Sequence, residues 1–225
     1  MYTPPGFQEH DRDKLHDFME HNSVATLVSS NEHEPFASHL PLLIERRRGT
    51  YGILTGHFAR ANPHWKSSNE QRVLTIFHGP HAYISPGWVQ WTSMVPTWNY
   101  VTVHAYGVLR IIEDATQLTD ILQRMVTRYE SGRDQPWSMD HAEDGYIDKL
   151  TAAIVGFEIE IDRLEGKWKL SQNHPQERRE QIISGLLDTQ RTDELQIARL
   201  MKETRSTAGH IAHRVSADPE DCPRR

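Results

Sequence analysis

Short runs of β-forming residues, separated by turn residues, are the feature of this sequence that most restricts its fold. The runs cover residues 24–29, 36–44, 50–57, 73–78, 81–85, 100–112 and 155–161. Gly79-Pro80 is expected to bend the chain sharply between two of them, and Gly166 is expected to end the strand pattern. Antiparallel strands of this kind favour a barrel, because closure removes the exposed edges of a sheet.

Helical periodicity marks several further segments. The clearest is 114–130, where an apolar stripe follows Asp114 and Gln117, which have the spacing of a capping box. This stripe must pack against another part of the fold. Other helices are expected at 11–22, in a short turn after Asn62-Pro63, at 143–153, after Pro175 and at 192–204.

The strands and helices together predict a mainly β protein with added helices, of the α+β class. At 225 residues the chain is long enough for one large domain with its own core. We expect a barrel domain with inserted helices over residues 1–170 and a helical appendage over 171–204. Residues 205–225 lack apolar periodicity and are expected to form a flexible tail.

Composition favours a cytoplasmic protein without a membrane partner. The single cysteine, Cys222, cannot form an internal disulfide, so an oxidising compartment is not indicated. No signal-peptide pattern opens the chain, and no run approaches the roughly 18 apolar residues of a membrane helix. The net charge of -6 argues against DNA binding unless basic residues gather on one face.

Histidine and tryptophan are frequent, with 14 and 6 residues, and four tryptophans lie in one central stretch: Trp65, Trp88, Trp91 and Trp98. Their side chains combine apolar bulk with a polar atom. Such a mixture suits the enclosure of a flat, partly polar ligand or a subunit interface. An ordinary aromatic core is the alternative.

The segment 56–65 joins the end of a strand to the start of a helix. Free backbone N–H groups and Arg60 could hold an anionic group there. The candidate residues in this segment are His57, Arg60, Asn62 and Trp65. A capped turn whose arginine pairs with a structural carboxylate is the alternative.

The segment 77–86 places His81, Tyr83 and Ser85 on one face of a strand, because side chains alternate with period two. Three hydrogen-bonding side chains would then point the same way. His78 and His81 could bind a metal ion, but no carboxylate or cysteine at a useful spacing supports a zinc site. We therefore expect no metal centre.

Two further segments carry candidate binding residues. Trp98, Asn99 and Tyr100 lead into the strand that bears His104, which suits stacking and edge recognition, although a buried polar network is the alternative. The other segment, 166–173, places two cations on one side of extended chain and follows them with short polar residues, which suits an anion unless the cations are simply solvated. Its candidate residues are Lys167, Lys169 and Gln172.

The sequence carries no evident catalytic motif. Cys222 lies in the tail, and the glycine-rich motifs of nucleotide-binding loops and the nucleophile elbow of hydrolases are absent. Whether the protein is an enzyme is therefore open. Any chemistry would come from a bound cofactor that the protein positions.

Four segments in this order, 56–63, 79–86, 95–100 and 166–173, closely resemble the PaiB-type family of FMN-binding negative transcriptional regulators. The resemblance extends from Met1 to about Met201. It implies a split β-barrel that forms a homodimer, binds FMN and acts in transcriptional repression, with DNA as a partner. The acidic charge does not support direct DNA binding, so repression could be indirect.

A related branch of this family consists of piperazate synthases, which are haem-dependent enzymes that form a nitrogen-nitrogen bond in N-hydroxyornithine. The resemblance therefore also implies haem b as an alternative cofactor, with His57 as the axial ligand and Arg60, Lys167 or Lys169 for the propionates. For FMN, the same cations would meet the phosphate, and Tyr83, Trp98 and Tyr100 would flank the ring. A protein-interaction module without a ligand is the remaining alternative.

Overall fold

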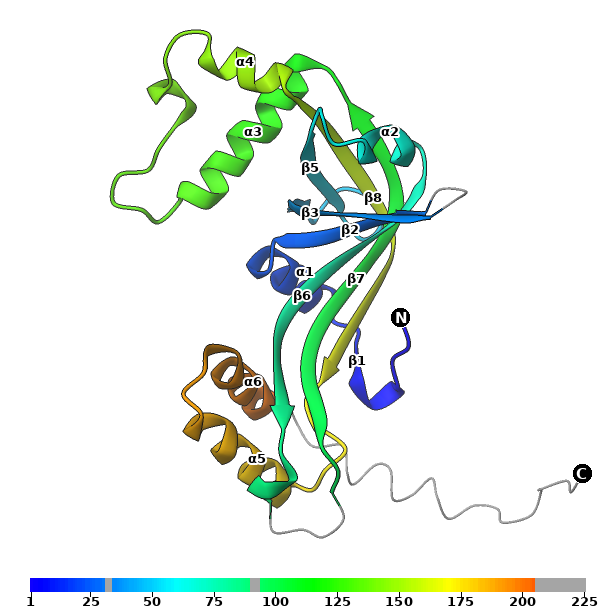
Figure 1. Ribbon diagram of the computed structural model, residues 1–225, viewed down its shortest axis with the longest axis vertical. Coiled ribbons are helices and arrows are strands. Elements are labelled where there is room, and N and C mark those ends of the chain that lie inside the picture. The colour runs from blue at the N-terminus through cyan, green and yellow to red at the C-terminus, as the bar shows by residue number, and fades with distance from the viewer. Residues whose placement is uncertain (31–33, 90–93, 205–225) are drawn as a thin grey trace, which may run out of the picture. The chain divides into compact units, whose positions relative to one another are not determined.

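The computed structural model describes residues 1–30, 34–89 and 94–204, and its main element is an antiparallel sheet (Figure 1). The strands follow the spatial order β3-β2-β6-β7-β8-β5-β4, and β1 pairs with β8. They are β1 (Gln8–Glu9), β2 (Val24–Ser30), β3 (Pro35–Pro41), β4 (Leu43–Glu45), β5 (Ile53–Ala59), β6 (Arg72–Ile84), β7 (Thr97–Ile112) and β8 (Ile154–Lys169). The expected tail at 205–225, with Cys222, and Trp91 lie outside the described residues.

Helices occupy the segments where the sequence shows helical periodicity. They are α1 (Arg12–His21), α2 (His64–Ser68), α3 (Ala115–Glu130), α4 (Tyr146–Ala152), α5 (Gln176–Asp188) and α6 (Thr192–Glu203), with 3-10 turns η1 (Pro5–Phe7), η2 (Pro86–Trp88) and η3 (Met139–His141). The Asp11 side chain accepts hydrogen bonds from two backbone N–H groups at the start of α1. The Asp114 side chain accepts one from the N–H of Gln117 at the start of α3, so Asp11 and Asp114 are confirmed as N-caps.

Two local expectations were wrong. Gly79-Pro80 does not separate two strands, because β6 runs through it without interruption to Ile84. Gly166 does not end the sheet either, since β8 continues to Lys169 and Gly166 pairs with Glu9 of β1. The sequence around Gly166 could not show this, because its partner strand lies at the other end of the chain.

The chain forms two compact units. The central unit comprises His10–His78 and Val103–Glu165, and the terminal unit comprises Met1–Glu9, Gly79–Thr102 and the residues from Gly166 onward. The helices α5 and α6 therefore group with the N-terminus and with parts of β6, β7 and β8.

The central unit has an aromatic and aliphatic core. Phe58 and Phe157 are fully buried, and their ring centroids are 4.6 Å apart. Gly107 lies so close to β8 that an added Cβ would stand 2.1 Å from the carbonyl oxygen of Glu160, so the backbones there are in contact. The helices α3 and α4 lie side by side in this unit (Figure 1).

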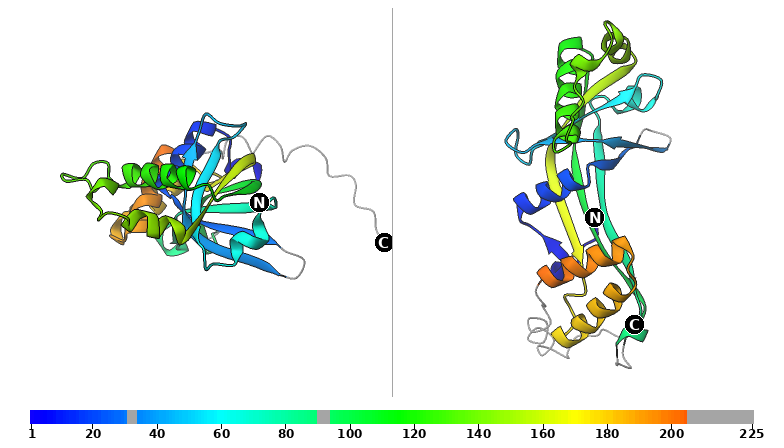
Figure 2. Two further views of the ribbon diagram at one scale, coloured as in Figure 1. Left: turned by 90° about the horizontal axis from the view of Figure 1, so that it is seen from above. Right: turned by 90° about the vertical axis from the view of Figure 1, so that its left-hand side faces the viewer.

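In the terminal unit, α5 and α6 pack side by side (Figures 1 and 2). The guanidinium of Arg179 is buried between them and donates hydrogen bonds to the carbonyl oxygens of Leu170, Met201 and Thr204. Burial lowers the pKa of Arg179. Its role is to satisfy the backbone acceptors where α6 ends.

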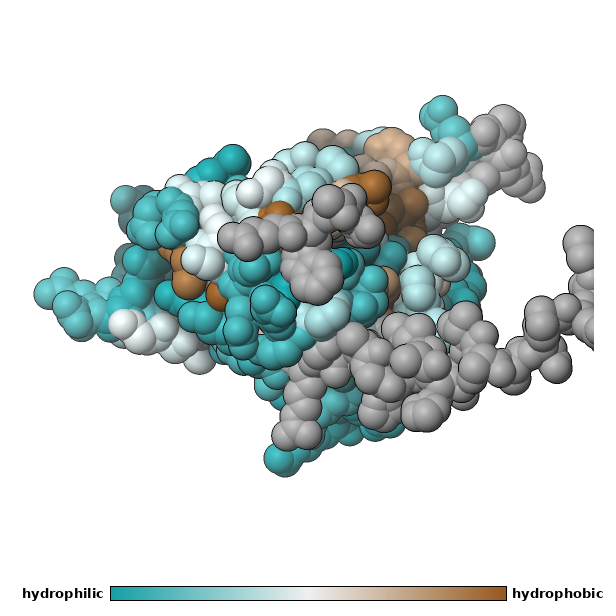
Figure 3. Space-filling model, turned by 90° about the horizontal axis from the view of Figure 1, so that it is seen from below, coloured by the Kyte–Doolittle hydropathy of each residue, from teal (hydrophilic) through white to brown (hydrophobic). Residues whose placement is uncertain are grey.

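One face of the molecule is mainly polar. Hydrophilic residues predominate on the face drawn in Figure 3, and hydrophobic residues are confined to a few areas of it. Among the described residues, every helix is too short or too polar to cross a lipid bilayer.

Candidate functional site

Two of the segments identified from the sequence meet in a pocket of about 300 Å³ in the terminal unit, which we call the lysine pocket. One wall comes from the start of β7 and the other from the end of β8 and the turn that follows it. Its polar lining consists of Thr97, Asn99, Lys169, Ser171, Asn173 and His174.

Lys169 of β8 lines this pocket, and Lys167 lies two residues before it on the same strand. The Lys169 ammonium donates hydrogen bonds to Thr97 Oγ1 (2.7 Å) and to the carbonyl oxygen of Trp98 (2.6 Å). The Lys167 ammonium donates to the carbonyl oxygen of Tyr2 (3.2 Å) and lies 5.0 Å from the ring centroid of Tyr100. Within the described part of the chain, neither lysine forms an ion pair with a carboxylate.

Both lysines are partly removed from water, so it matters that neither has a carboxylate partner among the described residues. Lys167 is only 8% exposed. Burial, and secondarily the charge of Lys167, lowers the pKa of Lys169. Buried cations are normally paired, so two adjacent lysines without carboxylates form a site whose electrostatics favour an anion.

A buried polar network holds the lysine strand in place. Asn99 is fully buried and donates to Ser171 Oγ (3.0 Å), which in turn donates to Asn99 Oδ1 (3.1 Å). Ser171 has a φ of 59°, which is the left-handed region that few non-glycine residues adopt. The Gln172 side chain accepts from the N–H of Leu170 and donates to the carbonyl of Trp168. Asn99 and Gln172 thus fix the turn and do not face solvent.

Exposed aromatic side chains lie on the same unit. Trp98 is 52% exposed, and its ring centroid lies 5.8 Å from that of Tyr83 in an edge-on arrangement. The ring of His81 lies 6.1 Å from that of Trp98, and its Nδ1 lies 3.5 Å from a carboxylate oxygen of Asp193. As expected, His81 and Tyr83 share the exposed face of β6. Ser85 accepts from the N–H of Gly87 and caps η2.

The segment 56–65 belongs to the central unit, where its arginine is used internally. Arg60 donates to the carbonyl oxygens of Ala152 and Ile154 (2.9 Å each) and pairs with Glu113 (3.2 Å). The indole N–H of Trp65 donates to the carbonyl of Arg60 (3.0 Å). These contacts match the structural alternative for this corner.

Asn62 leads to a buried histidine that sequence reasoning missed. Its side chain donates to Ser38 Oγ (3.0 Å), and both ring nitrogens of His64 are hydrogen-bonded, to Ser38 Oγ (2.8 Å) and to Ser29 Oγ (2.9 Å). His64 is fully buried, and burial lowers its pKa. No local pattern distinguishes His64 from its neighbours, because its partners come from β2 and β3.

Two other candidate histidines lie in the central unit. His57 is half-buried on β5, its Nδ1 is buried with no hydrogen-bond partner among the described residues, and burial lowers its pKa. The ring centroid of His104 lies 6.3 Å from that of Tyr106. Among the described residues, no group of three or more histidine, cysteine, aspartate or glutamate side chains is placed to hold a metal ion.

Comparison with known proteins identifies the family. Residues 1–163 match the family model described as "Putative FMN-binding domain". The chain is also 35% identical over 204 residues to the protease synthase and sporulation protein PAI 2 of Bacillus subtilis, covering 90% of this chain and 97% of that protein. This chain belongs to the PaiB-type FMN-binding family. FMN is the cofactor for which the matching domain is named.

Further comparisons give a second relative in sequence and two solved structures of similar fold. The uncharacterized protein AN0679 of Emericella nidulans is 32% identical over 189 residues, covering 66% of this chain and 74% of that protein. Among solved structures, the FAD and heme binding protein of Mycobacterium smegmatis has a TM-score of 0.55 at 17% identity, covering 79% of this chain and 80% of that chain. The flavocytochrome Anf3 of Azotobacter vinelandii has a TM-score of 0.53 at 15% identity, covering 72% and 69%. These likenesses confirm the split-barrel fold.

The residues of the lysine pocket fit the chemistry of FMN in this PaiB-type chain. FMN carries a phosphate dianion, a hydroxylated ribityl chain and a flat ring. The pocket offers Lys169 together with hydroxyl and amide groups, and the same unit adds Lys167 and exposed aromatic rings. The candidates in the terminal unit are His81, Tyr83, Ser85, Trp98, Asn99, Tyr100, Lys167, Lys169 and Gln172, whereas His57, Arg60, Asn62, Trp65 and His104 lie in the central unit.

Proposed function

We propose that this protein binds FMN at the lysine pocket, with the phosphate held by Lys167 and Lys169. The observation that carries the proposal is the pair of partly buried ammonium groups that face no carboxylate within the described chain. Thr97 Oγ1 and the Trp98 carbonyl fix the position of the Lys169 ammonium. A phosphate would supply the missing counter-charge in a site already built around the two cations.

The aromatic side chains around the pocket supply the flat surface that an isoalloxazine ring needs. Trp98 and Tyr83 are both exposed and in edge-on contact, and Tyr100 lies beside both lysines. We assign Trp98 and Tyr83 to the ring of FMN, because exposed indole and phenol rings in contact with one another stack well on flat ligands. Bound FMN would supply one-electron and two-electron redox chemistry.

The role that follows is a cytoplasmic, flavin-dependent regulatory or redox protein that acts as a homodimer. The name of PAI 2 links that relative to protease synthesis and sporulation, which favours regulation. The net charge of -6 favours an indirect effect on transcription over direct binding of DNA. Size-exclusion chromatography coupled to light scattering tests the dimer, and a mobility shift at low salt tests DNA binding.

Substitution of the two lysines tests the cofactor site. Lys167→Gln and Lys169→Gln should each weaken FMN binding by at least roughly tenfold, because each removes a charged hydrogen-bond donor from the phosphate. Quenching of flavin fluorescence during titration of the purified full chain measures the affinity. Lys149→Gln is the matched control, since Lys149 is an exposed lysine of the central unit.

Riboflavin provides a second control, because it lacks the phosphate. Its affinity should be nearly the same for the wild type and for both lysine variants. A folded Lys167→Gln/Lys169→Gln double variant that binds FMN as tightly as the wild type would show that the phosphate lies elsewhere.

Haem binding is the second candidate, and His57 favours it. Burial lowers the pKa of this imidazole and so favours the neutral form, which is the form that ligates iron, and its Nδ1 has no hydrogen-bond partner among the described residues. Added haem should then give a persistent Soret band that His57→Ala loses while the far-ultraviolet circular dichroism is unchanged. A band of equal intensity in both proteins would exclude His57 as the axial ligand.

A further inference from the structure

A second site lies in the central unit, in a groove between α3 and the sheet that we call the α3 groove. Its volume is about 540 Å³, and it is separate from the residues assigned to FMN. Three arginines and three carboxylates line it: Arg48, Arg110, Arg124, Glu45, Asp120 and Glu158. The groove therefore carries both signs of charge in equal number.

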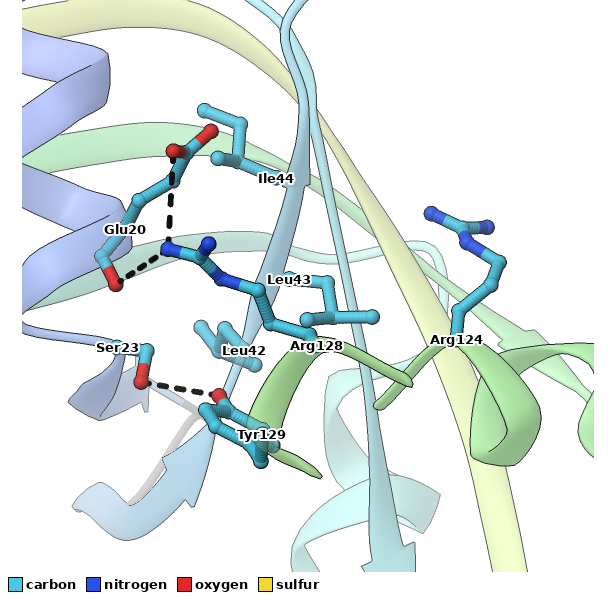
Figure 4. A pocket seen from close by; sticks show the side chains of 8 residues that line it. All are labelled: Glu20, Ser23, Leu42, Leu43, Ile44, Arg124, Arg128 and Tyr129. Carbon is cyan, nitrogen blue, oxygen red and sulfur yellow. Dashed lines mark hydrogen bonds and ion pairs between the residues drawn. The ribbon is translucent and has the colours of Figure 1, made fainter. Parts of the chain in front are cut away.

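The middle of the groove is closed by short ion pairs. Glu45 lies between Arg48 (3.2 Å) and Arg124 (2.9 Å), and Arg48 also pairs with Glu158 (3.1 Å). Figure 4 shows the neighbouring pocket, in which Arg128 reaches Glu20 while Arg124 points away from both. Arg124 lines both the groove and this neighbouring pocket, and the central charges of the groove already satisfy one another.

Two charges of the groove are held more loosely. Arg110 lies 3.4 Å from Glu160 and 3.8 Å from Glu70, which are long distances for a guanidinium-carboxylate pair. Asp120 lies 3.6 Å from Arg124, its ion-pair partner in the described structure, and its side chain is 65% exposed. Arg110 and Asp120 could therefore each exchange a weak ion-pair partner for a ligand at little cost in free energy.

The sheet side of the groove contains a buried polar atom that has no hydrogen-bond partner in the described part of the chain. Thr55 lines the groove and is 2% exposed, and its Oγ1 makes no hydrogen bond to any described residue. A buried hydroxyl in this state has lost its hydrogen bonds to water without replacement. Ile111, Ile112 and Ile121 add apolar surface beside it. A ligand that reaches Thr55 would restore its hydrogen bond and cover these side chains.

We propose that the α3 groove binds a small zwitterion of the aliphatic amino-acid class, with its carboxylate on Arg110 and its ammonium on Asp120. The Thr55 hydroxyl accepts a hydrogen bond from the ammonium of the ligand or donates one to its carboxylate. The aliphatic side chain of the ligand packs on the isoleucines. A ligand with one charge satisfies only one of the two loose groups. This site is independent of the FMN proposal and would let the protein respond to a metabolite.

Isothermal titration calorimetry of the full chain tests the site with L-leucine as the probe. Leucine should bind saturably, whereas 4-methylpentanoate, which lacks the amine, and 3-methylbutylamine, which lacks the carboxylate, should each bind at least roughly tenfold more weakly. Arg110→Gln and Asp120→Asn should each weaken leucine binding by a similar factor. Thr55→Val, which keeps the shape but removes the hydroxyl, should also weaken it.

Arg133→Gln is the matched control, because Arg133 pairs with Glu130 beyond the groove. Its affinity for leucine should equal that of the wild type, and FMN binding should be unchanged in every groove variant. The proposal is overturned if the wild type binds no alanine, valine, leucine or isoleucine, or if Arg110→Gln and Asp120→Asn bind leucine as the wild type does. The leucine result does not depend on whether the lysine variants lose FMN binding. Either proposal can therefore fail while the other stands.

Discussion

At the scale of single residues, burial separates side chains that the sequence presents as equivalent. Arg179 stands in a charged helix segment, yet it is 1% exposed and donates to three backbone carbonyls. The sequence correctly places Lys167 and Lys169 close together on one segment. It cannot show that neither has a carboxylate partner among the described residues, because that depends on how they pack against Tyr2 and Trp98. The pattern predicts the residue types, whereas their electrostatic state requires the fold.

His64 makes the stability of the fold depend on pH. Its pKa lies below the ordinary value of 6.5 because it is buried. The unfolded chain therefore takes up a proton first as the pH falls, so the stability that neutral His64 contributes is present above about pH 6.5 and is lost below it. The loss for one such group can reach about 1.4 kcal/mol per pH unit.

Urea unfolding at about pH 8 and about pH 5.5 checks this effect. The wild type should lose more free energy of unfolding between these conditions than His64→Gln, whose amide can still hydrogen-bond to the serines but does not titrate. His141→Gln, which alters an exposed histidine, should keep the wild-type dependence. Equal pH dependence in the wild type and His64→Gln would assign the loss to other groups.

At the scale of elements, the sequence predicts strands and helices well where the pattern is local. The caps at Asp11 and Asp114 and the alternation along β7 and β8 all follow from neighbours in the chain. The extension of β8 beyond Gly166 does not, because it depends on pairing with β1. The uninterrupted course of β6 through Gly79-Pro80 also depends on pairing, since neighbouring strands in a sheet can override a local preference to turn.

The contact between α5 and η2 gives a prediction at this scale. Gly185 lies inside α5, near its C-terminal end, where alanine would normally stabilise a helix by roughly 0.5–1 kcal/mol. A Cβ at this position would stand 2.4 Å from two ring atoms of Trp88. Gly185→Ala should therefore lower the free energy of unfolding by about 1–3 kcal/mol. Ser184→Ala, on the exposed side of the same helix, should not lower it.

Chemical denaturation of both variants, followed by tryptophan fluorescence, measures the difference. The emission of Trp88 should also change in Gly185→Ala, because its indole must move. If Gly185→Ala is as stable as Ser184→Ala, Trp88 does not pack tightly on α5.

At the scale of the whole molecule, the family and the fold class could be predicted, but the grouping of the candidate residues could not. The order of four motifs along the chain was sufficient for the family, which the comparisons confirm. The motifs fall into two compact units, because β6, β7 and β8 each contribute residues to both. Spacing along the sequence does not reveal which part of a long strand belongs to which unit.

Hydrogen exchange distinguishes ligand responses in the two units. FMN should slow amide exchange at residues 97–100 and 167–173 of the terminal unit, because the lysine pocket is built from these segments. Leucine should instead slow exchange in β4, β5, α3 and the end of β7 in the central unit, whose residues line the α3 groove. Mass spectrometry of peptides from the protein with each ligand alone and with both measures the two patterns. Protection by FMN confined to α3 and β5 would move the cofactor to the central unit, and protection by leucine at 167–173 would place both ligands in the lysine pocket.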